Sequence, residues 1–187
     1  MGTMETKQII DHCSQFTRDH IDLGWEPYLL SFMFNQLRGS PRSIPRQMEK
    51  EVERVYGISL TRVVRKPMSE NSRDKLPIWI GCPDFPVPKH VKLDLRDVSL
   101  NDGRHVHIIA LTPSNTRLNT GLDQHFEMCQ DLYVRSPYPL RRIHAVPITN
   151  RPEYVAEYVF KSLRRGRVNL DQVIILPRHR SELPRSK

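Results

Sequence analysis

Residues 90–111 read HVKLDLRDVSLNDGRHVHIIAL, and this stretch carries the strongest sheet signal in the chain. Apolar and charged side chains alternate from residue 90 to residue 98, which is the period of a half-buried strand. The turn-forming sequence Asn-Asp-Gly at 101–103 follows, and residues 104–111 are again apolar enough for a strand. The stretch therefore predicts a β-hairpin that places one face of each strand in the core.

Other segments on both sides of this hairpin predict further strands and helices. Gly57 is the predicted end of the second helix, and Thr149 or Asn150 is the predicted cap of the last one. Strands and helices around one core predict an α+β fold, an antiparallel sheet with helices packed on it. The predicted helices cover residues 5–22, 43–57, 122–132 and 150–165, and the predicted strands cover 26–37, 77–82 (an edge strand), 141–148 and 172–176.

The length and composition are those of one folded domain. The chain has 187 residues, of which 38% are hydrophobic and 27% charged, so a fibre or a wholly disordered chain is not expected. No apolar run approaches the length of a membrane span, and the N-terminus lacks a secretory pattern, so a cytoplasmic location is expected. The spacing of Cys13, Cys82 and Cys129 matches no zinc or redox motif, which predicts reduced thiols without a role.

The chain is basic, with a net charge of +8 and a pI of about 9.7. A polyanionic partner such as nucleic acid fits this balance, although solubility alone would also explain it. Much of the positive charge lies in the last quarter of the sequence. The arginines there that we select as candidate DNA-binding residues are Arg141, Arg142, Arg164, Arg165 and Arg167.

The triplet His105-Val106-His107 lies in the second strand of the predicted hairpin. Residues i and i+2 of a strand project from the same face, so both imidazoles can reach one divalent ion. With a carboxylate as third ligand, the set would favour Mg or Mn. Asp94 is the best candidate for that carboxylate, followed by Asp97 if a bulge intervenes, with Glu157 as a more distant choice. The alternative is a pair of solvated strand histidines.

The segment YVAEYVFK at 154–161 predicts a helix with two tyrosines on its polar side. At about 100° per residue, Tyr154, Tyr158 and Lys161 fall within roughly 60° of one another. The apolar residues of the segment fill the opposite arc and are expected to face the sheet. The alternative is an amphipathic surface helix whose tyrosines have no chemical role.

The two motifs together fit one reaction. A tyrosine hydroxyl is a weak nucleophile until it is activated, and a metal ion bound to a phosphate polarises the phosphorus and stabilises the developing charge. A neighbouring ammonium adds to that stabilisation. The product would be a covalent phosphotyrosine, and two tyrosines at i and i+4 could act in turn. A nuclease that activates water has no need of such a pair.

These residues resemble the signature of the HUH endonuclease superfamily, in which two histidines flank a hydrophobic residue. The tyrosine segment at 154–161 resembles the YxxxYxxK motif of two-tyrosine rolling-circle replication initiators of phages and plasmids. The segment LLSFMF at 29–34 is similar to the first hydrophobic motif of that family. The resemblance covers residues 25–176, which leaves 1–24 as a helical extension and 177–187 as a basic tail.

The resemblance implies a five-stranded antiparallel sheet of the ferredoxin or RNA-recognition type, with the histidines on a central strand. It implies a Mg or Mn ion and a 5′-phosphotyrosine, with Tyr158 as first nucleophile, Tyr154 as second and Lys161 as the residue that orients DNA or stabilises charge. The expected partner is single-stranded DNA or an origin hairpin, in the cytoplasm of a bacterial host and without a membrane. Because the chain has no GxxxxGK[ST] phosphate loop, unwinding and synthesis are expected to need a host helicase and polymerase.

Three alternatives remain at this stage. An HUH-type transposase would share the chemistry, so the sequence separates it poorly from a replication initiator. A non-catalytic RNA-recognition-like module would carry exposed aromatic residues on the sheet to stack bases. The predicted active face carries His, Asp, Lys and Arg instead, which favours a metal site. A structural phage protein with incidental motifs is the third alternative.

Overall fold

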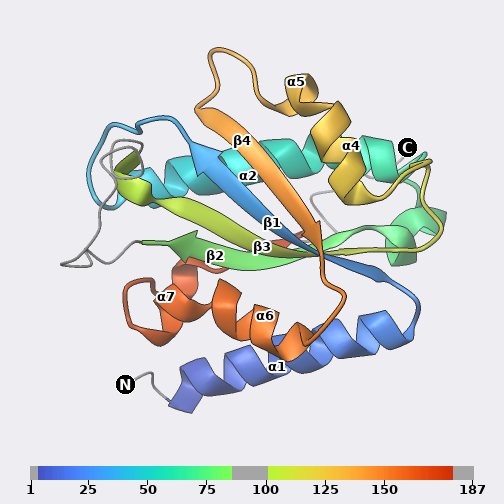
Figure 1. Ribbon diagram of the computed structural model, residues 1–187, viewed down its shortest axis with the longest axis horizontal. Coiled ribbons are helices and arrows are strands. Elements are labelled where there is room, and N and C mark those ends of the chain that lie inside the picture. Colours follow the sequence, from blue (N-terminus) through green and yellow to red (C-terminus); the bar gives the residue numbers. More distant parts are fainter. Residues whose placement is uncertain (1–3, 86–100, 179–187) are drawn as a thin grey trace.

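A five-stranded antiparallel sheet runs through the computed structural model, which describes residues 4–85 and 101–178 (Figure 1). The strand order is β4-β1-β3-β2-β5, so the strand with the two histidines is the middle one. The predicted α+β class and antiparallel sheet are confirmed. The strands are β1 (Glu26–Phe34), β2 (Ile78–Asp84), β3 (His105–Thr112), β4 (Leu140–Pro147) and β5 (Ile174–Leu176).

Helices cover both faces of the sheet (Figure 1). One face is packed against α1 (Met4–Asp22), α6 (Pro152–Val159) and α7 (Lys161–Arg164), and the other against α2 (Ser43–Val63), α4 (Leu122–Met128) and α5 (Gln130–Tyr133). Short 3-10 turns connect several elements. They are η1 (Glu70–Lys75), η2 (Asn101–Gly103) and η3 (Leu170–Gln172).

Strand β3 contributes side chains to both of the resulting cores. Val106 and Ile108 point to the core beneath α2, which also holds the fully buried Trp79. Ile109 and Leu111 point to the other core, beneath α1 and α6. Because the strand is covered on both sides, its apolar run is almost continuous. The face with Ile109 is also the face to which His105 and His107 belong.

The predicted hairpin pairing is wrong, because both edges of β3 are occupied by other strands. β1 pairs with β3 from Glu26↔Thr112 to Met33↔His105, and β2 pairs with its other edge from Ile78↔Leu111 to Asp84↔His105. Residues 90–98, the predicted partner, lie outside the described residues. The alternation of apolar and charged residues next to the turn at 101–103 predicted a hairpin. Strands β1 and β2, which are distant in sequence, pair with β3 instead and contribute buried apolar side chains to both cores.

Two further predictions need correction. Helix α2 does not end at the exposed Gly57 but continues to Val63, because Leu60 and Val63 extend its buried face by another turn. A single glycine inside a helix costs only about 1 kcal/mol, less than the burial of those side chains contributes. The strand predicted at the sheet edge, β2, lies between β3 and β5 and is buried on both faces.

The last predicted helix is present but interrupted. It begins after Arg151, whose φ of 49° is in the left-handed region, and not at Thr149 or Asn150. It breaks at Phe160 into α6 and α7, and Gly166 with a φ of 64° follows its end. The helix predicted over 122–132 is likewise divided at Cys129 into α4 and α5. The helix at 5–22 is confirmed by α1.

Alanine substitutions at two glycines are expected to change the free energy of unfolding in opposite directions, which tests the packing. A Cβ at Gly81 in β2 would overlap the backbone carbonyl oxygen of His107 and lie 2.8 Å from Ile108 Cδ1, so the strands could not keep their spacing. We expect Gly81→Ala to lower the free energy of unfolding by about 1–3 kcal/mol. A Cβ at Gly57 meets nothing within 4 Å. We expect Gly57→Ala to raise the free energy of unfolding by about 0.5–1 kcal/mol.

Urea denaturation of the two variants and the parent chain measures both effects. Equal stability of Gly81→Ala and the parent would contradict the close approach of β2 and β3.

Candidate metal centre

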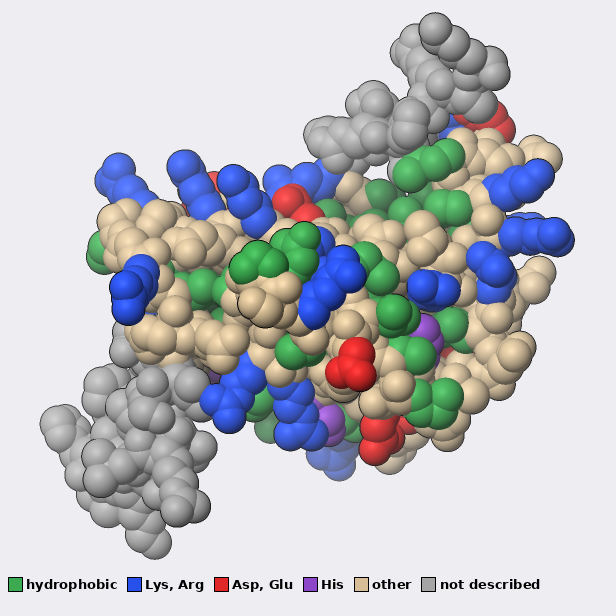
Figure 2. Space-filling model, turned by 90° about the horizontal axis from the view of Figure 1, so that it is seen from above, with side chains coloured by type: hydrophobic (Ala, Val, Ile, Leu, Met, Phe, Trp, Pro, Cys, Tyr) green, Lys and Arg blue, Asp and Glu red, His purple; other side chains and the backbone are tan. Residues whose placement is uncertain are grey.

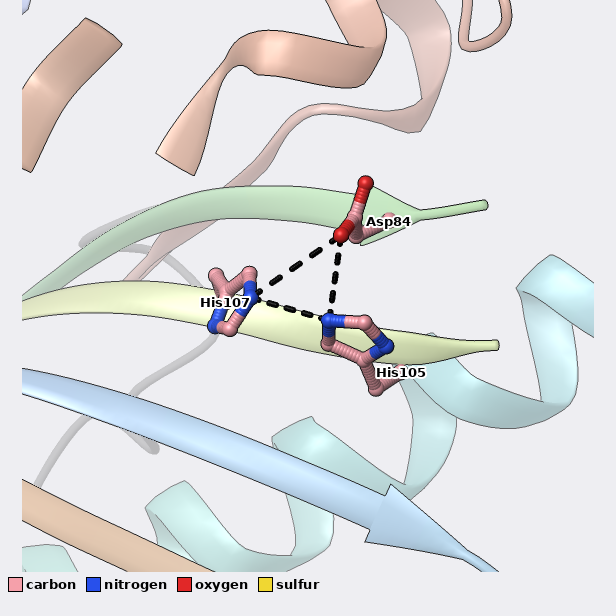
Figure 3. A group of neighbouring side chains, drawn as sticks. All are labelled: Asp84, His105 and His107. Atoms are coloured by element: carbon pink, nitrogen blue, oxygen red, sulfur yellow. Dashed lines mark hydrogen bonds and ion pairs between the residues drawn. The ribbon is translucent and has the colours of Figure 1, made fainter. Parts of the chain in front are cut away.

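Three side chains from two neighbouring strands converge at one end of the sheet (Figure 3). His105 and His107 are the first and third residues of β3, and Asp84 is the last residue of β2. The register places Asp84 directly opposite His105, and alternation brings His107 to the same face. One ligand atom from each residue lies within 4.8 Å of the other two, so the group could bind a metal ion.

The separations of the three ligand atoms suit a small divalent ion. His105 Nε2 lies 2.9 Å from His107 Nε2 and 3.0 Å from Asp84 Oδ2, while His107 Nε2 and Asp84 Oδ2 are 4.0 Å apart. A point midway along that longest line is therefore about 2 Å from its two ends and about 2.2 Å from His105 Nε2, close to the ligand distances of octahedral Mg.

Hydrogen bonds at the far side of each ring turn the Nε2 atoms toward this point. His105 Nδ1 lies 2.8 Å from the carbonyl oxygen of Gly103, and since a carbonyl only accepts, Nδ1 carries the hydrogen. His107 Nδ1 lies 3.0 Å from Ser31 Oγ on β1. The Ser31 hydroxyl can either donate to or accept from Nδ1, so this contact orients the ring of His107 without fixing its tautomer. Both Nε2 atoms are thereby directed toward Asp84 Oδ2, in a group that could bind a metal ion.

The protonation states of the buried ligands are those that metal binding requires. Burial lowers the pKa of His107 to about 3, with a further contribution from the charges of His105 and Lys161, although Asp84 opposes this. Burial by itself raises the pKa of Asp84, but hydrogen bonds from His105, Lys161 and Ser162 outweigh it and hold that pKa well below its usual range. A neutral imidazole and a carboxylate are thus present at neutral pH.

Helix α7 supplies the remaining contacts of Asp84. Ser162 Oγ donates a hydrogen bond to Asp84 Oδ1 at 2.6 Å, and it accepts one from the backbone N–H of Phe85 at 3.2 Å. Lys161 Nζ lies 2.7 Å from Asp84 Oδ2, the oxygen that faces His105. The carboxylate is therefore fixed from two sides, by a hydroxyl on one oxygen and an ammonium on the other.

The predicted tyrosine helix lies beside this group. The ring of Tyr158 is 4.8 Å from the ring of His107, and Lys161 Nζ lies 4.1 Å from the centre of the Tyr158 ring. Tyr154, one turn earlier on α6, is 64% exposed. The structure thus brings His105, His107, Tyr158 and Lys161 together, with Tyr154 on the solvent side of the same helix.

The carboxylate in the group is Asp84, which the sequence did not single out. Asp94 and Asp97 lie outside the described residues, and Glu157 is exposed and paired with Arg164 at 3.3 Å, away from the histidines. The available signal was an aspartate that ends an apolar run, IWIGCPD. This aspartate can be recognised as a partner of the histidines only when β2 is known to pair with β3, and the sequence pattern did not predict that pairing.

The five arginines selected from the sequence are placed differently. Arg141 and Arg142 are exposed on the edge strand β4, and Arg142 shares a face with His105, separated from it by Met33 of β1. The remaining three lie at or just after α7. Of these, Arg164 and Arg165 are exposed, whereas Arg167 is half-buried and donates to the carbonyl oxygen of Phe85 at 3.1 Å.

Comparisons with protein-family models, with curated proteins and with solved structures return no match for this chain. The arrangement of side chains around Asp84, His105 and His107 is therefore the basis for assigning a function. Among residues 4–85 and 101–178, no helix has both the length and the apolar character to cross a membrane.

The metal group predicts a binding experiment. We expect Mn²⁺ to bind the chain in calorimetric titration, and Asp84→Asn or His105→Ala to weaken the binding at least about tenfold, because each removes a ligand. Glu157→Gln is the matched control, since this exposed carboxylate lies on the neighbouring helix outside the group. Unchanged affinity in Asp84→Asn would exclude this carboxylate as a ligand.

The buried neutral His107 predicts acid sensitivity of the metal-free chain. The pKa of His107 is about 3 in the folded chain against an ordinary value of 6.5, so between these values the unfolded chain binds a proton that the folded chain does not. The free energy of unfolding should therefore fall as the pH is lowered through this window, by at most about 1.4 kcal/mol per pH unit from this residue.

Urea denaturation in the presence of a chelator, between pH 6.5 and about pH 4, measures the effect. His107→Gln should give a shallower pH dependence than the parent chain, and His12→Gln, which changes an exposed histidine of α1, should not. Equal slopes for His107→Gln and the parent would show that the ring at position 107 is protonated in the folded chain.

Proposed function

We propose that this chain is a metal-dependent endonuclease and strand transferase that nicks and rejoins single-stranded DNA through a 5′-phosphotyrosine at Tyr158, and that it initiates rolling-circle replication. The observation that supports the proposal most is the contact of Tyr158 with both His107 and Lys161, beside a buried carboxylate and two imidazoles. Phosphoryl transfer requires a positioned nucleophile and positive charge beside the phosphate. A phenol in contact with an ammonium and with a group that could bind a metal ion supplies both.

Each residue has a distinct part in the proposed reaction. Asp84, His105 and His107 would hold Mg or Mn, which supplies positive charge to a scissile phosphate when bound. The hydroxyl oxygen of Tyr158 forms a bond to phosphorus while the bond from phosphorus to the 3′ oxygen breaks. The Tyr158 proton leaves to solvent, and the 3′ oxygen takes up a proton to become a hydroxyl. Lys161 stabilises the negative charge that develops on the phosphate.

Joining reverses this step with a new 3′ hydroxyl. Tyr154 lies one helical turn before Tyr158 and is exposed, so in the proposal it serves as the second nucleophile that holds another 5′ end. Transposition uses the same chemistry, and the described residues do not favour it over replication.

The surface is compatible with a polyanionic partner. Figure 2 shows many Lys and Arg side chains and few Asp or Glu side chains on the face seen from above. On the histidine face of the sheet, β1 and β4 present Met33, Arg142, His144 and Val146 to solvent, so His144 is the one ring among them and no Phe, Tyr or Trp of these two strands is exposed on this face. This counts against the RNA-recognition-like module. Single-stranded DNA or an origin hairpin remains the proposed partner, with a host helicase and polymerase in the bacterial cytoplasm.

A covalent-adduct assay tests the proposal. The chain is incubated with end-labelled single-stranded DNA carrying a candidate origin and with Mn²⁺, and then denatured. We expect a labelled protein adduct that Tyr158→Phe abolishes, and that His107→Ala reduces at least about a hundredfold because the metal group is lost. Tyr154→Phe should keep the first cut and impair joining. Tyr138→Phe, which changes an exposed tyrosine in the loop between α5 and β4, is the matched control.

Cleavage by Tyr158→Phe that leaves a free 5′ phosphate would indicate a water nucleophile and end the tyrosine mechanism. Normal joining by Tyr154→Phe would restrict the mechanism to one tyrosine.

A further inference from the structure

Lys161 and the metal group share one carboxylate oxygen. Asp84 Oδ2 lies 2.7 Å from Lys161 Nζ and 3.0 Å from His105 Nε2, while Asp84 Oδ1 is occupied by Ser162. The side chain of Asp84 is 5% exposed, whereas that of Lys161 is 25% exposed, so the lysine side chain reaches solvent and the carboxylate is enclosed. The carboxylate is held in place by β2 and by Ser162.

An ammonium and a divalent ion on the same oxygen repel each other strongly. Their repulsion acts at a largely buried site, where charges are screened less than in water. Metal binding to Asp84 Oδ2 must therefore weaken the contact of Lys161 with that oxygen. A second acceptor for the ammonium is already present, because Lys161 Nζ lies over the ring of Tyr158, 4.1 Å from its centre.

We propose that Lys161 is an exchangeable counter-cation of Asp84, which holds the carboxylate in its ligand position before the metal binds and is displaced from it when the metal binds. The displaced ammonium stays at the ring of Tyr158, where it is free to pair with a phosphate. The inference rests on the metal site of the proposed function. It makes the phosphate-binding capacity of Lys161 conditional on metal occupancy, so that a site without metal offers no free ammonium beside the tyrosine.

The competition predicts that removal of the ammonium strengthens metal binding. In calorimetric titration with Mn²⁺ at low ionic strength, we expect Lys161→Met to bind about tenfold more tightly than the parent chain, because no cation has to leave Asp84. Lys161→Arg, which keeps the charge, should bind like the parent. Arg164→Met is the matched control, because Arg164 lies on the same helix but pairs with the exposed Glu157.

A second measurement uses the unmodified chain and is independent of any folding defect in a variant. Limited acetylation with acetic anhydride, followed by mass spectrometry, reports how accessible the Lys161 amine is. Mn²⁺ should increase the acetylation of Lys161 severalfold and leave Lys50, exposed on α2, unchanged.

The outcomes separate the two proposals. If the parent chain binds no Mn²⁺, the metal site fails, and the proposed function fails with it. If the parent binds Mn²⁺ but Lys161→Met binds it equally or more weakly, or if Mn²⁺ does not increase the acetylation of Lys161, only the exchange of Lys161 is overturned. Tighter binding by Lys161→Met together with increased acetylation of Lys161 supports it.

Discussion

The pairing of β2 with β3 is the constraint on which the candidate site depends. It sets Asp84 opposite His105 at one end of both strands and brings a carboxylate to two imidazoles that are far from it in sequence. A slip of one residue would turn Asp84 to the opposite face, toward the core beneath α2. In this register a Cβ at position 81 would overlap the carbonyl oxygen of His107, so the pairing as observed requires the glycine there.

Helices α6 and α7 depend on the same pairing. Cys82, two residues before Asp84, donates through Sγ to the carbonyl oxygen of Val159 at 3.3 Å, near the point where the helix breaks. After the break, Lys161 and Ser162 both reach Asp84. An uninterrupted helix would continue the 100° steps past Phe160 and direct these side chains differently. The break at Phe160 therefore directs Lys161 and Ser162 toward the carboxylate of Asp84, and Tyr158 lies on the helical turn before the break.

Features that depend on short-range periodicity could be predicted from the sequence. The two histidines share a face because a strand alternates, and Tyr154 and Tyr158 lie one turn apart on α6 because a helix repeats near 3.6 residues. The approach of Lys161 to Tyr158 and Asp84 depends in addition on the break at Phe160, which the sequence did not predict. The α+β class also follows from local patterns. The identity of Asp84 and the neighbours of β3 could not be predicted, because they depend on which distant strands pair. The turn at 101–103 favoured a local partner, whereas β1 and β2 occupy both edges.

The two histidines differ in their exposure to solvent, so one end of the metal group is more accessible than the other. The side chain of His107 is 5% exposed and that of His105 is 26% exposed, so the group is closed at its inner end and open at its outer end. Of the two imidazoles, His105 is thus the one that solvent and solutes reach, and His107 is the one that the surrounding side chains shield from them.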